Sequence, residues 1–257
     1  MQHLVKQDSI VRKIWGKADT VLFIFAGAAA EFALNKAVDW LYFTGKLPAD
    51  PLGRLFSTVT YSQRVIFSTT DAAYAAIDQI TAIHKHVETA RGTQIPDWAY
   101  RDVLFMLIDY SIRSYELLER SLTLAEKEEV FEVFYRVGIR MHIDGLPTNY
   151  ASWKIMRESH LNQDLQFSDF TRDLFKQYRQ HLGLIRYVLL RLVQALMAPE
   201  RVKTLLTLRN VHLLKPLLYM YKLSESVKLQ GYLRNALLPS KYKIQIQDIE
   251  QVKILTH

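Results

Sequence analysis

The stretch DPLGRLFSTVTYSQRVIFSTTDAAYAAIDQITAIHKHV, residues Asp50–Val87, predicts two consecutive helices. The first begins at Asp50 and Pro51, because an acidic residue is a good N-cap and proline at the first helical position loses no hydrogen bond. It runs to about Phe67. Ser68–Asp71 then interrupts the pattern and supplies a second N-cap. We therefore expect a helical hairpin here, and the rest of the chain is interpreted around it.

The second helix of this hairpin carries a face of apolar residues at spacings of three and four. Its members are Ala73, Ala76, Ile77, Ile80, Ile83 and Val87. His84 lies on the same face, whereas His86 points roughly the other way. On the first helix, Arg54 and Thr58 are four residues apart and share a face. Taken alone, His84 fits a hydrogen-bonded core histidine better than an axial ligand of haem iron, and the Arg54–Thr58 pair fits a solvated surface.

The motifs DPLGRLxxT at 50–58 and IHxxV at 83–87 resemble the MpaB/latex-clearing-protein family of helical oxygenases. This family is named for a mycophenolic-acid-pathway oxygenase and for the rubber oxygenases. Three further stretches resemble the same family in the same order: AGAAAEFAL at 26–34, LTLAE at 122–126 and GLP at 145–147. The resemblance covers about residues 20–155, and it is the order and spacing of these motifs together that carries it.

The resemblance implies a b-type haem with His84 as the proximal iron ligand. It also implies that Arg54 and Thr58 are polar neighbours of this site that activity requires. The family's chemistry is the O2-dependent cleavage of C=C bonds, so the expected protein is a haem-dependent oxygenase acting on an apolar, unsaturated, lipid- or isoprenoid-like substrate. The alternative is a non-catalytic helical module that binds small apolar ligands or an anionic membrane surface.

Four positions depart from the family pattern. Ser57 stands where rubber oxygenases have a lysine just before the threonine. Leu107 takes the histidine position of a WxH motif, and Leu34 begins the pair at which the family has His-Pro. The glycine that usually closes the HxxVxG motif is displaced to Gly92. Because of these departures, we expect neither a lysine as the sixth iron ligand nor a second histidine that takes part in the chemistry. His84 remains as the expected proximal ligand.

Composition limits the other possibilities. The chain has 257 residues, 49% of them hydrophobic and 23% charged, with nine glycines, seven prolines and no cysteine. The lack of cysteine excludes disulfides, thiolate metal sites and Cys-ligated haem. No GxGxxG, P-loop or GxSxG motif is present, which argues against nucleotide-dependent enzymes and hydrolases. His142 and His160 form no HxxxH or HExxH motif, so a zinc site has no support.

An apolar run of ten residues at 21–30, VLFIFAGAAA, predicts the first buried helix, continuing to about Tyr42. The run is too short for a membrane span, and acidic residues in the preceding segment argue against a signal peptide, so we expect a cytoplasmic protein. Further helices are predicted at 98–120, 122–142, 150–162, 182–198 and 205–221. Residues 242–255 alternate in polarity and predict a lone strand or extended tail. On the helix at 98–120, Asp109 fits a surface or capping carboxylate, with proton handling as the alternative.

The C-terminal third is basic. Residues 172–243 contain 14 Lys and Arg and three acidic residues, a local charge of +11 against +7 for the whole chain. Two interpretations remain open: a solvated basic face, or peripheral docking on an anionic membrane, where each cation near the headgroups contributes about 1 kcal/mol. No nucleic-acid partner is expected. We expect an all-α, globin-like multi-helix bundle forming a single domain at 1–257, with a family-like core at about 20–165 and a basic helical extension at 166–257.

Overall fold

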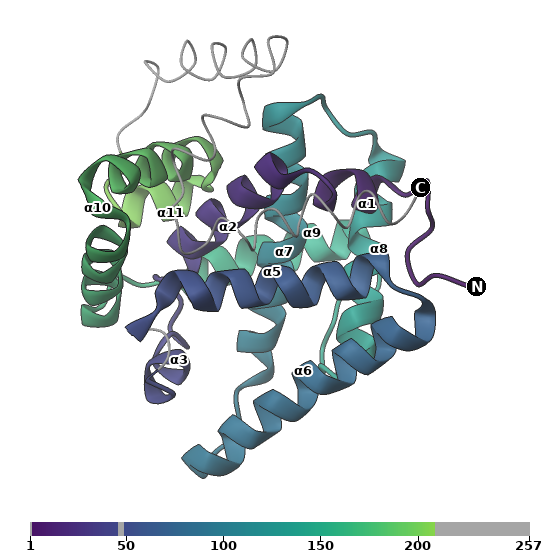
Figure 1. Ribbon diagram of the computed structural model, residues 1–257, viewed down its shortest axis with the longest axis horizontal. Coiled ribbons are helices and arrows are strands. Elements are labelled where there is room, and N and C mark those ends of the chain that lie inside the picture. The colour runs from purple at the N-terminus through teal and green to yellow at the C-terminus, as the bar shows by residue number, and fades with distance from the viewer. Residues whose placement is uncertain (1, 46–48, 209–257) are drawn as a thin grey trace.

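The computed structural model describes residues 2–45 and 49–208, which form α-helices and two isolated β-bridges (Figure 1). The expected all-α multi-helix bundle is confirmed, and the helices predicted at 98–120, 122–142 and 150–162 are all observed. The helices of this described part are α1 Ile10–Trp15, α2 Ala18–Phe32, α3 Asp39–Phe43, α5 Pro51–Phe67, α6 Thr70–Arg91, α7 Asp97–Leu118, α8 Leu124–Arg140, α9 Tyr150–Gln163, α10 Asp169–Met197 and α11 Glu200–Leu205.

The packing of α2 against α7 forms the centre of the bundle. Small residues on α2 allow the two helices to approach closely. A Cβ atom added to Gly27 would lie 2.3 Å from the ring of Tyr110, which is fully buried. The AGAAA sequence therefore makes room for an aromatic side chain of the neighbouring helix, because interiors pack too densely to absorb an extra carbon there.

The first buried helix is α1, and not the helix predicted from the apolar run at 21–30. Val11, Ile14 and Trp15 are completely buried in the core. The mixed charge of this segment concealed the helix, because one of its cations is buried as well. Arg12 Nε donates a hydrogen bond of 3.1 Å to the carbonyl oxygen of Val5, so its charge faces the protein and not the solvent.

The predicted continuation of the next helix to about Tyr42 is wrong, because α2 ends at Phe32. The cause is Asn35, whose Oδ1 accepts a hydrogen bond of 2.8 Å from the backbone N–H of Ala37. Such a local side-chain bond competes with helical hydrogen bonding and favours a turn. The chain resumes helical structure only at Asp39, as the short α3.

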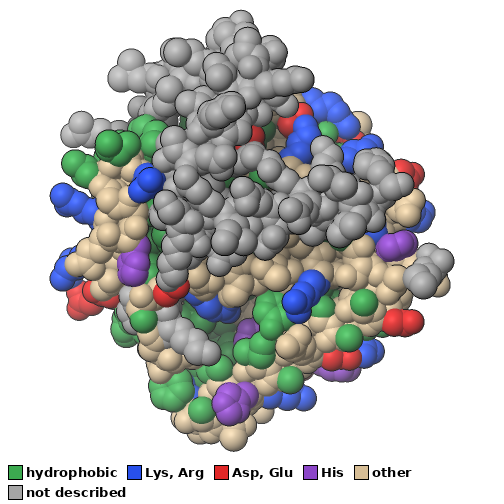
Figure 2. All heavy atoms as spheres, in the orientation of Figure 1, with side chains coloured by type: hydrophobic (Ala, Val, Ile, Leu, Met, Phe, Trp, Pro, Cys, Tyr) green, Lys and Arg blue, Asp and Glu red, His purple; other side chains and the backbone are tan. Residues whose placement is uncertain are grey.

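The predicted hairpin of α5 and α6 is confirmed. Asp50 caps α5 by accepting a hydrogen bond of 3.0 Å from the backbone N–H of Gly53. Near the turn α6 packs tightly, with Ala73 and Ile77 buried, whereas Ile83 further along is exposed. The two helices diverge from their turn, with part of α7 behind them (Figure 1). Figure 2 shows the surface hollowed between α5 and α6, with a histidine side chain inside the hollow.

The chain after α9 packs on the same core, since Tyr178, Met197 and Val202 belong to the cluster that contains the N-terminal helices. The helix predicted at 182–198 is the second part of α10. The helix predicted at 205–221 does not begin there: α11 ends at Leu205 and Thr207 has a positive φ of 52°. Residues 209–221, the tail at 242–255 and the rest of the predicted extension beyond 208 lie outside the described residues. Within the described ranges, no helix combines the length and apolarity that crossing a bilayer requires.

Candidate functional site

The structure brings together Arg54, Thr58 and His84, the three residues singled out from the sequence. Arg54 Nη1 donates hydrogen bonds to Thr58 Oγ1 at 2.9 Å and to Ser57 Oγ at 3.3 Å, all within α5. The charge of Arg54 acts on the ring of His84 in α6 and helps to lower its pKa. From α7, Tyr100 meets His84 edge-on, with the ring centroids 5.2 Å apart. We call Arg54, Thr58, His84 and Tyr100 the His84 cluster.

His84 is a neutral imidazole with a buried, unused nitrogen. Its Nδ1 atom is buried and has no hydrogen-bond partner among the described residues. Burial lowers the pKa of His84 to about 4; the positive charge of Arg54 adds to the decrease and the negative charge of Glu88 opposes it. A buried nitrogen without a partner is unusual, and a neutral imidazole is the form that ligates metals. The ring therefore has the protonation state and the free nitrogen that an iron ligand needs.

Glu88 fixes the position of Tyr100 in the His84 cluster. Its Oε1 accepts hydrogen bonds from Tyr100 Oη at 3.1 Å and from the backbone N–H of Ile95 at 2.9 Å. Burial, followed by the charge of Glu88, raises the pKa of Tyr100, so this phenol stays protonated. Gly92 ends α6 with a left-handed φ of 73°, which lets the chain turn back into α7. The displaced glycine of the family pattern is thus the C-cap of α6.

The departures from the family pattern place no additional ligand near His84. Ser57 is a short hydroxyl that donates a hydrogen bond of 2.8 Å to the carbonyl oxygen of Arg54 in its own helix. Leu107 packs against the hydrophobic core, and Leu34 is fully buried in it. None of these three residues adds a ligand, so the His84 cluster contains one histidine and one cation.

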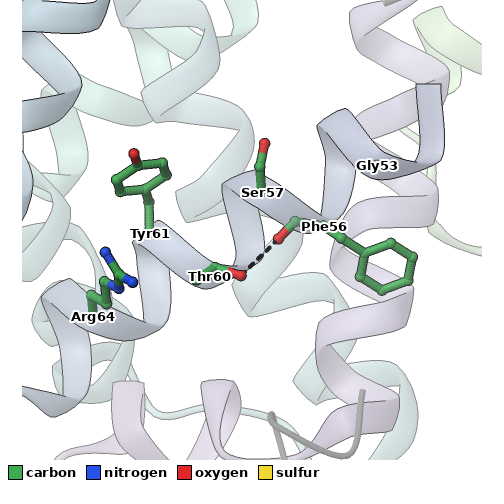
Figure 3. A pocket seen from close by; sticks show the side chains of 6 residues that line it. All are labelled: Gly53, Phe56, Ser57, Thr60, Tyr61 and Arg64. Atoms are coloured by element: carbon green, nitrogen blue, oxygen red, sulfur yellow. Dashed lines mark hydrogen bonds between the residues drawn. The ribbon is translucent and has the colours of Figure 1, made fainter. Parts of the chain in front are cut away.

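A small pocket adjoins the cluster on the neighbouring face of α5 (Figure 3). Its volume is about 290 Å³, at the lower end of the range for small-molecule sites. The described residues that line it all come from α5: Gly53, Phe56, Ser57, Thr60, Tyr61 and Arg64. It contains none of the members of the His84 cluster. Since one helix supplies these walls, the pocket does not by itself define a binding site.

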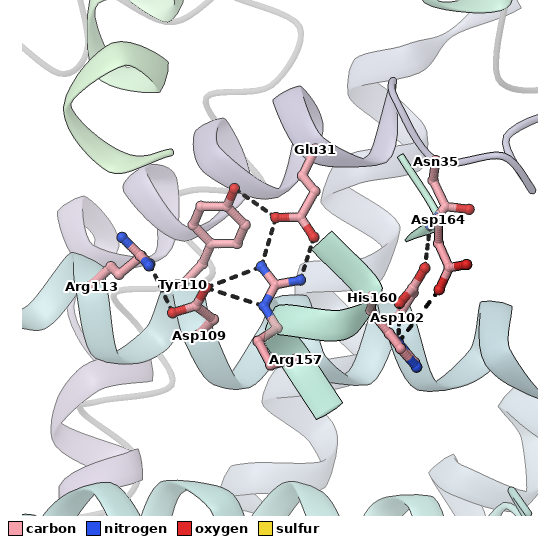
Figure 4. Close-up of polar contacts among 9 residues, drawn as sticks. All are labelled: Glu31, Asn35, Asp102, Asp109, Tyr110, Arg113, Arg157, His160 and Asp164. Carbon is pink, nitrogen blue, oxygen red and sulfur yellow. Dashed lines mark hydrogen bonds and ion pairs between the residues drawn. The ribbon is translucent and has the colours of Figure 1, made fainter. Parts of the chain in front are cut away.

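A second histidine belongs to a polar group that sequence reasoning missed (Figure 4). His160 Nδ1 forms a hydrogen bond with Asp102 Oδ1, and Asp164 Oδ2 lies 3.8 Å from the same nitrogen. The other oxygen of Asp102 accepts a bond of 2.7 Å from Asn35 Nδ2. Potential ligand atoms of the three acidic and histidine residues lie within 4.8 Å of one another, a spacing that could hold a metal ion.

The hydrogen bonds of this polar group link α7, α9 and the turn after α2. His160 Nδ1 and both oxygens of Asp102 already have partners, and Phe105 stacks on the imidazole at 5.2 Å. Burial, together with the charge of Asp102, raises the pKa of Asp164. The four-residue spacing of His160 and Asp164, the C-cap of α9, was the one signal in the sequence. Asp102 comes from another helix, and only folding brings it near.

The largest ionic network of the described residues surrounds Arg157 of α9 (Figure 4). This fully buried guanidinium donates hydrogen bonds to Glu31 Oε2 at 2.6 Å and to Asp109 Oδ2 at 3.0 Å. Tyr110 Oη also donates to Glu31 Oε2, at 3.0 Å, and Arg113 pairs with the second oxygen of Asp109 at 2.8 Å. Asp109 is therefore neither a surface nor a capping residue. It belongs to a network that joins α2, α7 and α9.

The low pKa of His84 predicts how the stability of the protein responds to acid. Above pH 6.5 the imidazole is neutral in the folded and the unfolded chain. Between pH 6.5 and about 4 the unfolded chain binds a proton that the folded chain does not, so the free energy of unfolding falls as the pH is lowered. The loss approaches at most about 3 kcal/mol at the acid end. Urea unfolding of the wild type and of His84→Gln across this range checks it: as the pH falls, the wild type should lose more stability than the variant, and a difference that does not change with pH would contradict the prediction.

Comparison with known protein families identifies the chain. Residues 12–219 match the family described as ER-bound oxygenase mpaB/B'/Rubber oxygenase, catalytic domain. Because the match covers more than half of the chain, the protein belongs to this family. The resemblance noted at about residues 20–155 is thereby confirmed, and the match continues through α10 and α11. No curated protein and no solved structure matches the chain.

Proposed function

We propose that the protein binds haem b at the His84 cluster, with His84 as the iron ligand, and oxidises an apolar, unsaturated substrate with O2. The observation that carries the proposal is a neutral imidazole whose buried Nδ1 has no partner in the part of the chain that the structure describes, in a member of an oxygenase family. Lipid- or isoprenoid-like molecules are the substrate class, because cleavage of C=C bonds is the chemistry that the family resemblance implies.

The residues of the cluster fit such a group. Imidazole is a standard haem ligand, and the pKa of His84 keeps the ring neutral and able to coordinate. Arg54 is partly buried, its pKa is lowered by burial, and it forms no ion pair with a described carboxylate. A buried cation without a counter-charge is costly, so Arg54 suits the carboxylate of a haem propionate.

The chain's own residues would position and shield the cofactor. Haem, when bound, supplies the iron centre at which O2 is activated. Thr58 would hold the guanidinium of Arg54 in place through their bond of 2.9 Å, and the charge of Arg54 acts on His84. Tyr100, which donates a hydrogen bond to Glu88, would pack against the imidazole on one side of the cofactor site. Arg54 and Thr58 are therefore the residues that would contact propionate, oxygen or substrate.

An absorption spectrum with a pyridine haemochrome assay tests the proposal. The protein should be purified from cells supplied with a haem precursor. A strong Soret band at close to one haem per chain is the expected result, and consumption of O2 with unsaturated lipids is the assay that follows. A colourless protein that also fails to take up added hemin would contradict it. The remaining function would then be a helical module for apolar ligands, which the leucine at the WxH histidine position favours.

A further inference from the structure

The second part of α10 exposes an apolar face. α10 bends at Gly183, whose φ of 74° is left-handed, and the segment after the bend carries Leu184 and Ile185 with exposed fractions of 61% and 77%. Val188 is exposed as well. Leu192 follows at the same helical spacing, so these residues lie along one side of the segment. Along the rest of the described sequence, the exposed large apolar residues are at least eleven positions apart, except for Phe167 and Phe170.

The opposite side of this segment fixes its orientation. Tyr187, Leu190 and Val193 pack against the hydrophobic core, so the exposed side cannot turn inward without losing those contacts. A soluble helix normally directs its apolar face to the core and its polar face outward. This segment has apolar residues on both sides, and an apolar patch kept at the surface indicates a binding partner.

A row of cations precedes this apolar face on the same helix. Arg172, Lys176 and Arg179 are exposed and spaced by four and three residues, so they line one side of the first part of α10. Arg172 pairs with Asp169, whereas Lys176 and Arg179 form no ion pair within residues 2–45 and 49–208. Figure 2 shows Lys and Arg side chains beside hydrophobic ones over α10, at the left edge of the molecule.

We propose that α10 docks on the surface of an anionic lipid bilayer through Lys176 and Arg179 before the bend and through the apolar face of Leu184, Ile185 and Val188 after it. Cations next to exposed aliphatic side chains on a surface helix match the headgroup phosphates and the acyl boundary beneath them. A second copy of the chain fits less well as the partner. In a symmetric contact the Lys and Arg side chains of the two copies would lie close together and repel each other. The proposal stands independently of haem binding.

Vesicle co-sedimentation of the full chain tests the proposal. Vesicles of phosphatidylcholine mixed with phosphatidylglycerol should bind the protein, vesicles of phosphatidylcholine alone should bind it weakly, and salt should weaken binding. Replacing both Lys176 and Arg179 by Gln should lower the affinity about 25-fold, since each cation near the headgroups contributes about fivefold. Ile185→Gln should lower it about tenfold through the loss of buried apolar area.

The chain offers matched controls on α9. Ile155 is 76% exposed, almost the same as Ile185, and Lys154 is exposed beside it. Ile155→Gln and Lys154→Gln should leave vesicle binding unchanged, and circular dichroism should show that every variant keeps its helical content. Three results would overturn the proposal: no binding to anionic vesicles, equal binding to neutral ones, or equal effects of the α9 and α10 variants. A change in self-association by Ile185→Gln, without a change in vesicle binding, would assign the face to a second copy of the chain.

Discussion

Replacing Arg157 by Met is expected to lower the free energy of unfolding by about 3 to 5 kcal/mol, the usual cost of removing one partner of a buried ion pair. Methionine has a similar length and leaves little cavity, so the effect measures charge more than volume. The reason is that Glu31 loses its guanidinium partner at 2.6 Å and Asp109 loses one of its two arginines. Urea unfolding followed by circular dichroism measures the change. Since domains are stable by only about 5 to 15 kcal/mol, the loss is a large share of the total.

Arg140 provides the control for this prediction. It pairs with Asp78 at 2.6 Å through a similar two-bond contact, but both side chains are exposed. Arg140→Met should therefore destabilise the fold much less than Arg157→Met, because solvent screens an exposed ion pair. Adding Glu31→Gln to Arg157→Met should recover part of the loss, because one unpaired buried charge is removed. Equal effects of the two arginine variants would show that burial does not govern the strength of this network.

The second large effect is expected at His84. If the protein holds haem as proposed, the haem content of purified His84→Ala should fall from close to one per chain to below about a tenth, because the change removes the residue proposed to bind the iron. Pyridine haemochrome measures the content. Adding imidazole to the His84→Ala protein should restore part of the Soret band, which a purely structural role of the side chain would not produce.

His86 is the matched control for this experiment. It lies two residues further along α6, is exposed, and should tolerate replacement by Ala with no change in haem content. Retention of full haem by His84→Ala would disprove the ligand assignment even though the family assignment stands. Loss of haem from both variants would point to damage to α6, and the helical content of each variant distinguishes that result.

Much of the fold follows from short-range signals. The cap at Asp50, the break before α6 and the helical spacing of apolar residues predicted the α5–α6 hairpin close to its observed bounds. Four-residue spacing also placed Arg54 beside Thr58. These features depend on the geometry of one or two helical turns, which local sequence encodes directly.

The predictions from the sequence were wrong where a side chain forms a hydrogen bond with a residue more than one helical turn away along the chain. Mixed charge concealed α1 because Arg12 is buried against a backbone carbonyl. The helix expected to reach about Tyr42 ends at Phe32, where Asn35 makes a local turn and also pairs with Asp102 of α7. Periodicity describes how side chains are arranged around one helix, and it contains no information on partners supplied by another.

The sequence by itself determined the class of fold, the hairpin and, through the resemblance of its motifs, the family. Only the tertiary structure decided that the buried Nδ1 of His84 has no hydrogen-bond partner within residues 2–45 and 49–208, and that Arg54 lies close enough to lower the pKa of His84. It also decided that Arg157 joins three helices and that one side of α10 is left exposed. The physical reason is the same in each case: the burial, charge and hydrogen bonding of a side chain depend on neighbours that are far away along the chain.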